Sequence, residues 1–267
     1  MLTRFDNRVR GVSAALAGLL LACPAFAQDG DAGADRQRPP SKDRMILGIG
    51  AAITPTYQGS DEYRVLPMPA IDIVSGPFYA NLRNGVGLNV VDTDMLTIGG
   101  GVALMPGYRR KDVPEGVGRV SFGAGSRLYA SLNAGGVIAT VGGTKGFAGS
   151  TRGFIADASL SYPIVASKRT LIIPSIATTW ADRRHNDRYF GIGPDEALAS
   201  GLPAFRADSG FKDISAAVTV NYRLNARINL TATGGITTLL GAVNDSPLVI
   251  RETQPTGFLS PSYRLGS

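Results

Sequence analysis

The sequence predicts an all-β protein: an antiparallel transmembrane β-barrel of about 12 strands, with a short helix in one long outer loop. Three observations support this prediction. Apolar and polar residues alternate over segments of about ten residues, the length that a tilted strand needs to cross a bilayer. The polar faces of these segments carry Arg, Asp and Asn, which a wet barrel interior tolerates and a sandwich core does not. The connections between segments alternate between short and long.

The N-terminal region has the features of a secretory signal. Three arginines precede a short apolar run, and Ala25-Phe26-Ala27 matches a signal-peptidase cleavage site. The apolar run is too short to span a bilayer as a helix. A lipoprotein is the alternative, because Leu20-Leu21-Ala22-Cys23 resembles a lipobox, but Leu21 is unusual before the small residue. We predict that residues 1–27 are a cleaved signal peptide and that the protein is exported through the Sec route to the outer membrane of a Gram-negative cell.

The predicted mature chain offers little for thiol, metal or nucleic-acid chemistry. Cleavage removes the only cysteine, three arginines and one aspartate, which leaves 24 basic and 20 acidic residues. That excess is spread along the chain, whereas a nucleic-acid site needs basic residues clustered on one face. One histidine lacks partner ligands for a transition metal. We predict no cofactor, no metal and no nucleic-acid partner. Residues 28–44 are predicted to be a disordered tail, and residues 45–265 a single barrel domain.

Strict alternation defines the strands of the predicted barrel. In residues 119–133 an apolar face alternates with a face of Arg, Ser and Asn, and residues 154–162 and 215–224 repeat the pattern. A soluble sandwich would show the same period, so strand length and the charged polar faces favour the barrel. We place strands near residues 45–53, 66–74, 77–83, 86–91, 95–108, 118–132, 135–142, 153–163, 169–181, 211–224, 227–240 and 256–265.

The lengths of the connections give the predicted barrel its orientation. Every second connection is short, as in outer-membrane barrels with short periplasmic turns and long outer loops. Asn84-Gly85 is an exception, because it is a tight hairpin signal on the long-loop side. Residues 77–83 and 86–91 are too short to cross a membrane alone. Ten strands or an uneven barrel are therefore alternatives to twelve equal strands.

The longest connection, Trp180–Asp213, is unusual in a compact domain unless it carries structure or function. Pro194 and Gly201 predict the start and end of a short helix. The charged run around His185 predicts a solvated loop tip without a nucleophile elbow, so we expect no enzyme activity. Acidic side chains in this loop could bind calcium, but their spacing fits no calcium loop and nearby arginines favour salt bridges. The candidate structural or interaction residues are Trp180, Asp182, Tyr189, Phe190, Lys212 and Asp213.

A second candidate group lies on the polar faces of the predicted strands. If the apolar faces meet lipid, these side chains point inward, and rings of arginine favour anions in a pore. The alternative is that Asp157 and other inward carboxylates pair with the arginines and close the interior. We favour closure, because a barrel of about twelve strands is narrow enough to be filled by side chains or by an infolded loop. The candidate lumen-facing residues are Arg119, Arg127, Asp157, Arg223 and Arg227.

Several spaced motifs resemble those of the MipA/OmpV family of outer-membrane proteins. They are residues 57–69, Thr179-Trp180-Ala181-Asp182, Tyr189-Phe190-Gly191, Ser200-Gly201-Leu202-Pro203, Gly210-Phe211-Lys212-Asp213, Leu239-Leu240-Gly241 and Asp245-Ser246-Pro247-Leu248-Val249. The resemblance covers roughly residues 45–265, and it is specific because the motifs occur together. One departure is the C-terminus: such barrels usually end in an aromatic assembly signal, where this chain has Leu265 followed by two residues.

The resemblance implies a non-enzymatic barrel embedded in outer-membrane lipid. Members of the family are described as scaffolds that link a lytic transglycosylase to a penicillin-binding murein synthase. The leading hypothesis is therefore an interaction scaffold for the synthesis and hydrolysis of peptidoglycan. The alternative is a narrow porin-like channel for small solutes, anions included. The sequence indicates no oligomeric state.

Overall fold

The computed structural model describes residues 43–265. The predicted signal peptide 1–27 and residues 28–42 of the predicted tail lie outside this range. The strands are β1 (Arg44–Pro55), β2 (Tyr63–Ser75), β3 (Phe78–Asn81), β4 (Gly85–Asp92), β5 (Leu96–Met105), β6 (Gly123–Ala134), β7 (Val137–Ala148), β8 (Phe154–Ser161), β9 (Ile164–Ser167), β10 (Thr170–Ala181), β11 (Gly210–Arg223), β12 (Ile228–Leu239) and β13 (Thr253–Leu265). The α-helices are α1 (Arg183–Phe190) and α2 (Pro194–Ser200), and η1 (Arg110–Asp112) and η2 (Gly241–Val243) are single 3₁₀ turns.

All the described strands belong to one closed antiparallel sheet. Strands that follow one another in the chain pair with each other, except β8 and β9; β1 pairs with β13, and β10 pairs with β11 to complete the ring. Both β8 and β9 pair with β10, so they form one strand that is interrupted at Pro163, a residue without a backbone donor. The predicted barrel of twelve antiparallel strands is confirmed, and it is uneven because β3 has only four residues.

The wall alternates as the sequence predicts. On β1, Leu47, Ile49 and Ile53 are exposed on the outside, whereas Ala52 and Thr54 are buried. On β11, Ile214 and Val218 are exposed while Thr219 is buried. Apolar side chains on the outer surface suit lipid rather than water, because a soluble protein rarely leaves such a large continuous apolar surface exposed.

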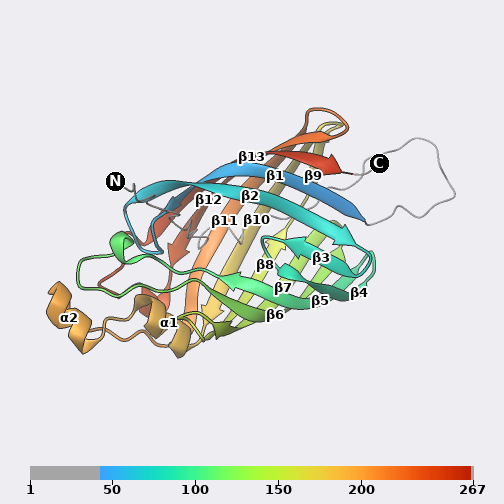
Figure 1. The fold of residues 1–267 in the computed structure, drawn as a ribbon. Coiled ribbons are helices and arrows are strands. Elements are labelled where there is room, and N and C mark those ends of the chain that lie inside the picture. Colours follow the sequence, from blue (N-terminus) through green and yellow to red (C-terminus); the bar gives the residue numbers. More distant parts are fainter. Residues whose placement is uncertain (1–42, 266–267) are drawn as a thin grey trace, which may run out of the picture.

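The two ends of the barrel differ. At the inner end, short turns join the strands; at the outer end lie the long loops, with α1 and α2 among them (Figure 1). None of the helices in residues 43–265 has the length and hydropathy to cross a membrane. Helix α2 is the predicted helix, with Pro194 at its start and Gly201 in the left-handed conformation at its end. Helix α1 was not predicted, because its charged sequence suggested an irregular loop tip.

Four outer loops pack into a shared hydrophobic cluster, which we call the cap. Its buried residues are Tyr57, Tyr108, Val113, Val117, Val120, Tyr189, Phe190, Ile192, Ala207, Leu239, Val243 and Leu248. Hydrogen bonds tie the loops together: the Tyr57 hydroxyl donates to the Leu248 carbonyl at 3.0 Å, and the Tyr108 hydroxyl to the Tyr189 carbonyl at 3.0 Å. The cap is thus a small core of its own at the outer end.

The outer half of β2 has a strand partner on one edge only. β2 pairs with β1 along its whole length, but with β3 only over residues 72–75. Pro67 and Pro69 lie in this outer half, where they pair with Ala51 and Ile49 of β1. A proline nitrogen carries no donor, which suits a strand that has a partner on one edge only. The short β3 and β4 leave a notch in the wall at this point.

Candidate functional site

The turn between β3 and β4 folds into the barrel and crosses its interior. Leu82 packs against the buried cluster of Ala52, Met68 and Phe258, which come from β1, β2 and β13. The next residue, Arg83, donates through Nη2 to Ser159 Oγ on β8 at 2.5 Å. Strands β13 and β8 lie on different sides of the ring. Two consecutive residues of one turn therefore reach distant parts of the wall.

Arg127 on β6 is the centre of a polar network beneath this turn. Its guanidinium donates to both oxygens of Asp157 on β8, at 2.6 and 3.0 Å, and to Thr144 Oγ1 on β7 at 3.0 Å. Its Nε donates to Asn84 Oδ1 in the β3–β4 turn at 3.1 Å. Both charged side chains are 5% exposed. A bidentate arginine–carboxylate pair of this kind is strongly directional. Because Arg127 also bonds to Asn84, the network holds the turn against three strands.

The glycine at position 142 makes room for the guanidinium. A Cβ placed on Gly142 would lie 2.5 Å from Arg127 Nη2. Any larger residue on this interior position of β7 would displace the arginine. The network therefore depends on one small residue as well as on the charged pair.

A second buried pair lies where the longest outer loop enters β11. Lys212 Nζ donates to Asp213 Oδ2 and, at 3.0 Å, to Gln58 Oε1 in the β1–β2 loop. Lys212 is 5% exposed and Asp213 is fully buried. Because the pair bonds to another loop, it joins the β10–β11 connection to the cap.

Helix α1 turns its only histidine inward. Asp182 accepts a hydrogen bond from the His185 backbone nitrogen at 2.8 Å and so caps the helix. The predicted solvated histidine is wrong, because His185 is 4% exposed and stacks on Tyr189 with ring centroids 6.1 Å apart. Burial, and then the charge of Lys212, lower the pKa of His185 from 6.5 to about 3. The imidazole is therefore neutral at physiological pH.

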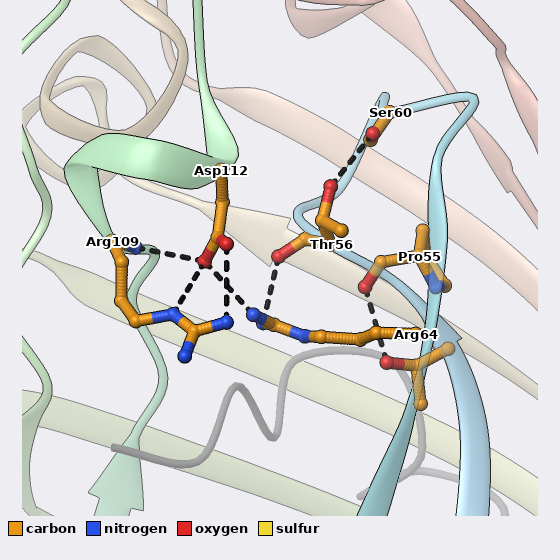
Figure 2. A network of polar contacts seen from close by, with 7 residues as sticks. Pro55, Thr56, Ser60, Arg64, Arg109 and Asp112 are labelled. Carbon is orange, nitrogen blue, oxygen red and sulfur yellow. Dashed lines mark hydrogen bonds and ion pairs between the residues drawn. The ribbon is translucent and has the colours of Figure 1, made fainter. Parts of the chain in front are cut away.

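An ion-pair network bridges the notch beside β2 (Figure 2). Arg64 on β2 donates to Asp112 Oδ2 of η1 at 2.8 Å and to the Thr56 carbonyl at 2.8 Å. Arg109 donates to the same carboxylate at 2.9 and 3.1 Å. Burial alone would raise the pKa of Asp112, but its bonds to Arg109 and Arg64 lower it below the usual range. The network fastens the β5–β6 loop to the strand edge that β3 leaves open.

The predicted lumen residues lie in different settings. Arg127 and Asp157 meet in the buried network, and Arg223 is half-buried at the inner end of β11. Arg119 lies outside the strands, because β6 begins only at Gly123, and it is exposed. Arg227 lies in the exposed β11–β12 turn and donates to the Tyr263 hydroxyl at 3.2 Å. The structure therefore does not bring these four arginines together in a ring.

Most of the predicted outer-loop residues pack or form hydrogen bonds that stabilise the loops. Tyr189 and Phe190 belong to the cap, Asp182 caps α1, and Lys212 and Asp213 form the buried pair. Trp180 lies on the outer surface of the barrel against Phe154. Within residues 43–265, no three His, Cys, Asp or Glu side chains are grouped where they could hold a metal ion.

The β3–β4 turn was missed as a functional element. Its sequence signal, Asn84-Gly85, indicated a tight hairpin but not its direction. One sequence signal could have revealed the inward turn. Leu82 and Arg83 lie between two strands that are too short for the turn to extend past the end of the barrel.

Comparison with known proteins places the chain among outer-membrane barrels. A model of the family "MltA-interacting protein MipA" matches residues 47–265. YiaT of Escherichia coli strain K12, provisionally named an outer membrane protein, is 24% identical over 114 residues, which cover 43% of this chain and 46% of YiaT. The chain thus spans less than half the length of the curated relatives it matches.

Solved structures similar to the chain include membrane channels. The KdgM porin has a TM-score of 0.44 and 7% identity, covering 83% of this chain and 99% of the porin. An outer membrane channel from Pseudomonas putida F1 has a TM-score of 0.46 and 12% identity, covering 90% of this chain and the whole of the channel.

Proposed function

Because the chain belongs to the MltA-interacting protein MipA family of outer-membrane barrels, we propose that it is a non-enzymatic scaffold that holds peptidoglycan-processing enzymes at the outer membrane. The partners that we propose are a lytic transglycosylase, as the family name suggests, and a penicillin-binding murein synthase. The observation that supports this proposal best is the filled interior. The β3–β4 turn and the Arg127–Asp157 pair occupy the space that a pore would need.

A channel for small anions is the second candidate, and the interior gives it less support. Anion selectivity needs positive charge that is free to attract the solute. Asp157 neutralises Arg127, and both are 5% exposed. Many interior wall positions are polar, including the bonded pair Thr219 and Thr233. Small anions could pass along these polar interior walls only if the β3–β4 turn moved aside.

The scaffold predicts that partners contact the inner end of the barrel. A photo-crosslinking residue placed at Gly76, Lys168 or Arg169, in the short inner turns, should capture a lytic transglycosylase or a murein synthase in intact cells. The matched control is Leu198, which is 87% exposed on α2 at the outer end and should capture neither enzyme. Failure of all three inner positions to capture a periplasmic enzyme would overturn the scaffold proposal.

Conductance separates the two candidates. A scaffold with a filled interior should give no current steps in a planar bilayer. Stable, ion-selective steps from the unmodified protein would favour the channel.

A further inference from the structure

Aromatic side chains mark one level of the outer wall. Trp180 on β10 lies opposite Phe211 on β11, and its ring centroid is 6.4 Å from that of Phe154 on β8. Phe154 is 37% exposed and Phe211 is 60% exposed. In membrane barrels, a belt of aromatic residues lies at the boundary between hydrocarbon and headgroups. These three rings therefore place the outer ends of β8, β10 and β11 at the headgroup level of the outer leaflet.

Three cations lie at or just beyond these rings. Lys145 on β7 is the register partner of Phe154, Arg152 precedes Phe154 by two residues, and Arg183 begins α1. Asp182 connects the group, because Lys145 Nζ lies 3.7 Å from its Oδ2. Gly153, the residue after Arg152, lies close to the same carboxylate, because a Cβ placed on it would be 2.4 Å from Asp182 Oδ1. We call Lys145, Arg152 and Arg183 the rim cations.

The rim cations carry more positive charge than the nearby carboxylates offset. The Lys145 and Arg183 side chains are 57% and 60% exposed, and the only carboxylate beside Arg183 that the described ion pairs include is Asp208, at 3.4 Å. Exposed ion pairs of this length contribute little. Two further exposed arginines, at positions 184 and 188, extend the positive surface along α1. The cations are therefore available to another anion.

We propose that the rim cations bind the phosphate groups of a phosphorylated glycolipid in the outer leaflet. Arginine matches phosphate with paired N–H donors, and lysine adds a point charge. The aromatic rings beneath provide apolar contact for the acyl chains of the same molecule, which a free phosphate ion would not use. This lipid site is independent of the scaffold proposal, because it lies at the opposite end of the barrel.

The test compares two lipids that differ only in phosphate. The full mature protein in detergent micelles is titrated with diphosphorylated lipid A and with the same lipid A lacking both phosphates, and bound lipid is counted by native mass spectrometry. The diphosphorylated lipid should bind more tightly. The triple variant Lys145→Ala, Arg152→Ala, Arg183→Ala should weaken its binding by about tenfold or more.

A matched variant controls for net charge. Lys168→Ala, Arg169→Ala, Arg227→Ala removes three exposed cations from the inner end and should leave binding unchanged. The double variant Arg152→Lys, Arg183→Lys keeps the charge at the rim and should retain most of the lipid binding. Equal binding of the two lipids, or equal loss in the two triple variants, would overturn the proposal. Displacement of the lipid by an equal concentration of inorganic phosphate would also overturn it, because the site would then select free phosphate.

Discussion

The outer and inner ends of the barrel are built in opposite ways. At the outer end, four loops share the cap, and ion pairs such as Arg64–Asp112 fasten loop to wall. At the inner end, short turns such as that around Arg227 are exposed and bond mainly to themselves. The inner end and the strands need only local alternation, whereas the outer end needs contacts between residues far apart in the chain. Disruption should therefore affect the two ends unequally.

The largest effect is expected from the interior pair. Asp157→Ala leaves the Arg127 guanidinium buried without its counter-charge, which should lower the free energy of unfolding by about 3–5 kcal/mol. Urea unfolding followed by the fluorescence of Trp180, the only tryptophan, measures this loss. Arg227→Ala removes an exposed charge at the inner end and should change stability by less than about 0.5 kcal/mol. Similar losses in both variants would contradict the contrast between interior and inner turns.

The cap should respond almost as strongly, but locally. Phe190 is fully buried, so Phe190→Ala should cost about 3–5 kcal/mol within the cap. Limited proteolysis should then cut the β10–β11 loop while the barrel keeps its folded mobility on unheated gels. Leu198→Ala, at an 87% exposed position of the same loop, should leave the protease pattern unchanged. If Phe190→Ala also unfolds the barrel, the cap is not a separate core.

Acid should loosen the outer end before the inner end. His185 has a pKa of about 3 in the fold against 6.5 when exposed, so the opened cap binds a proton that the closed cap does not. The contribution of His185 to the stability of the cap is fully present above pH 6.5, and it is lost progressively as the pH falls from that value towards the folded pKa. Protease cleavage of the outer loops should rise between pH 6 and pH 4. His185→Phe should remove this part of the rise; an unchanged pH profile would show that another group is responsible.

The smallest effect is expected at the notch. Arg64→Ala leaves Asp112 with Arg109 as its remaining partner and the Thr56 carbonyl without its donor, a loss of about 1–3 kcal/mol. Hydrogen exchange should increase in the β5–β6 loop and along the outer half of β2. Arg110→Ala, a neighbouring exposed position, is the control. Equal exchange in both variants would mean that the ion pairs do not hold the loop.

Sequence alone predicted the wall well and its contents poorly. The alternation in segments such as 215–224 is local, so it identified strands, their faces and a count of about twelve, with ten left open. Arg127 and Asp157 could be placed on polar faces, but their pairing depends on the register of three strands. The burial of His185 depends on packing between α1 and distant loops, and its charged neighbours suggested the reverse. For the β3–β4 turn, the sequence did not show that the turn points into the barrel.

We expect the β3–β4 turn to close the barrel. Single-channel conductance tests it on the native chain and on a variant with Leu82→Gly, Arg83→Gly and Asn84→Gly, which removes the contacts of the turn and keeps its length. Asn225→Gly, Ala226→Gly, Arg227→Gly in an inner turn is the matched control. The native protein and the control should be silent, and the β3–β4 variant should conduct. Conductance of the native protein at the level of that variant, or silence of a folded β3–β4 variant, would contradict the claim.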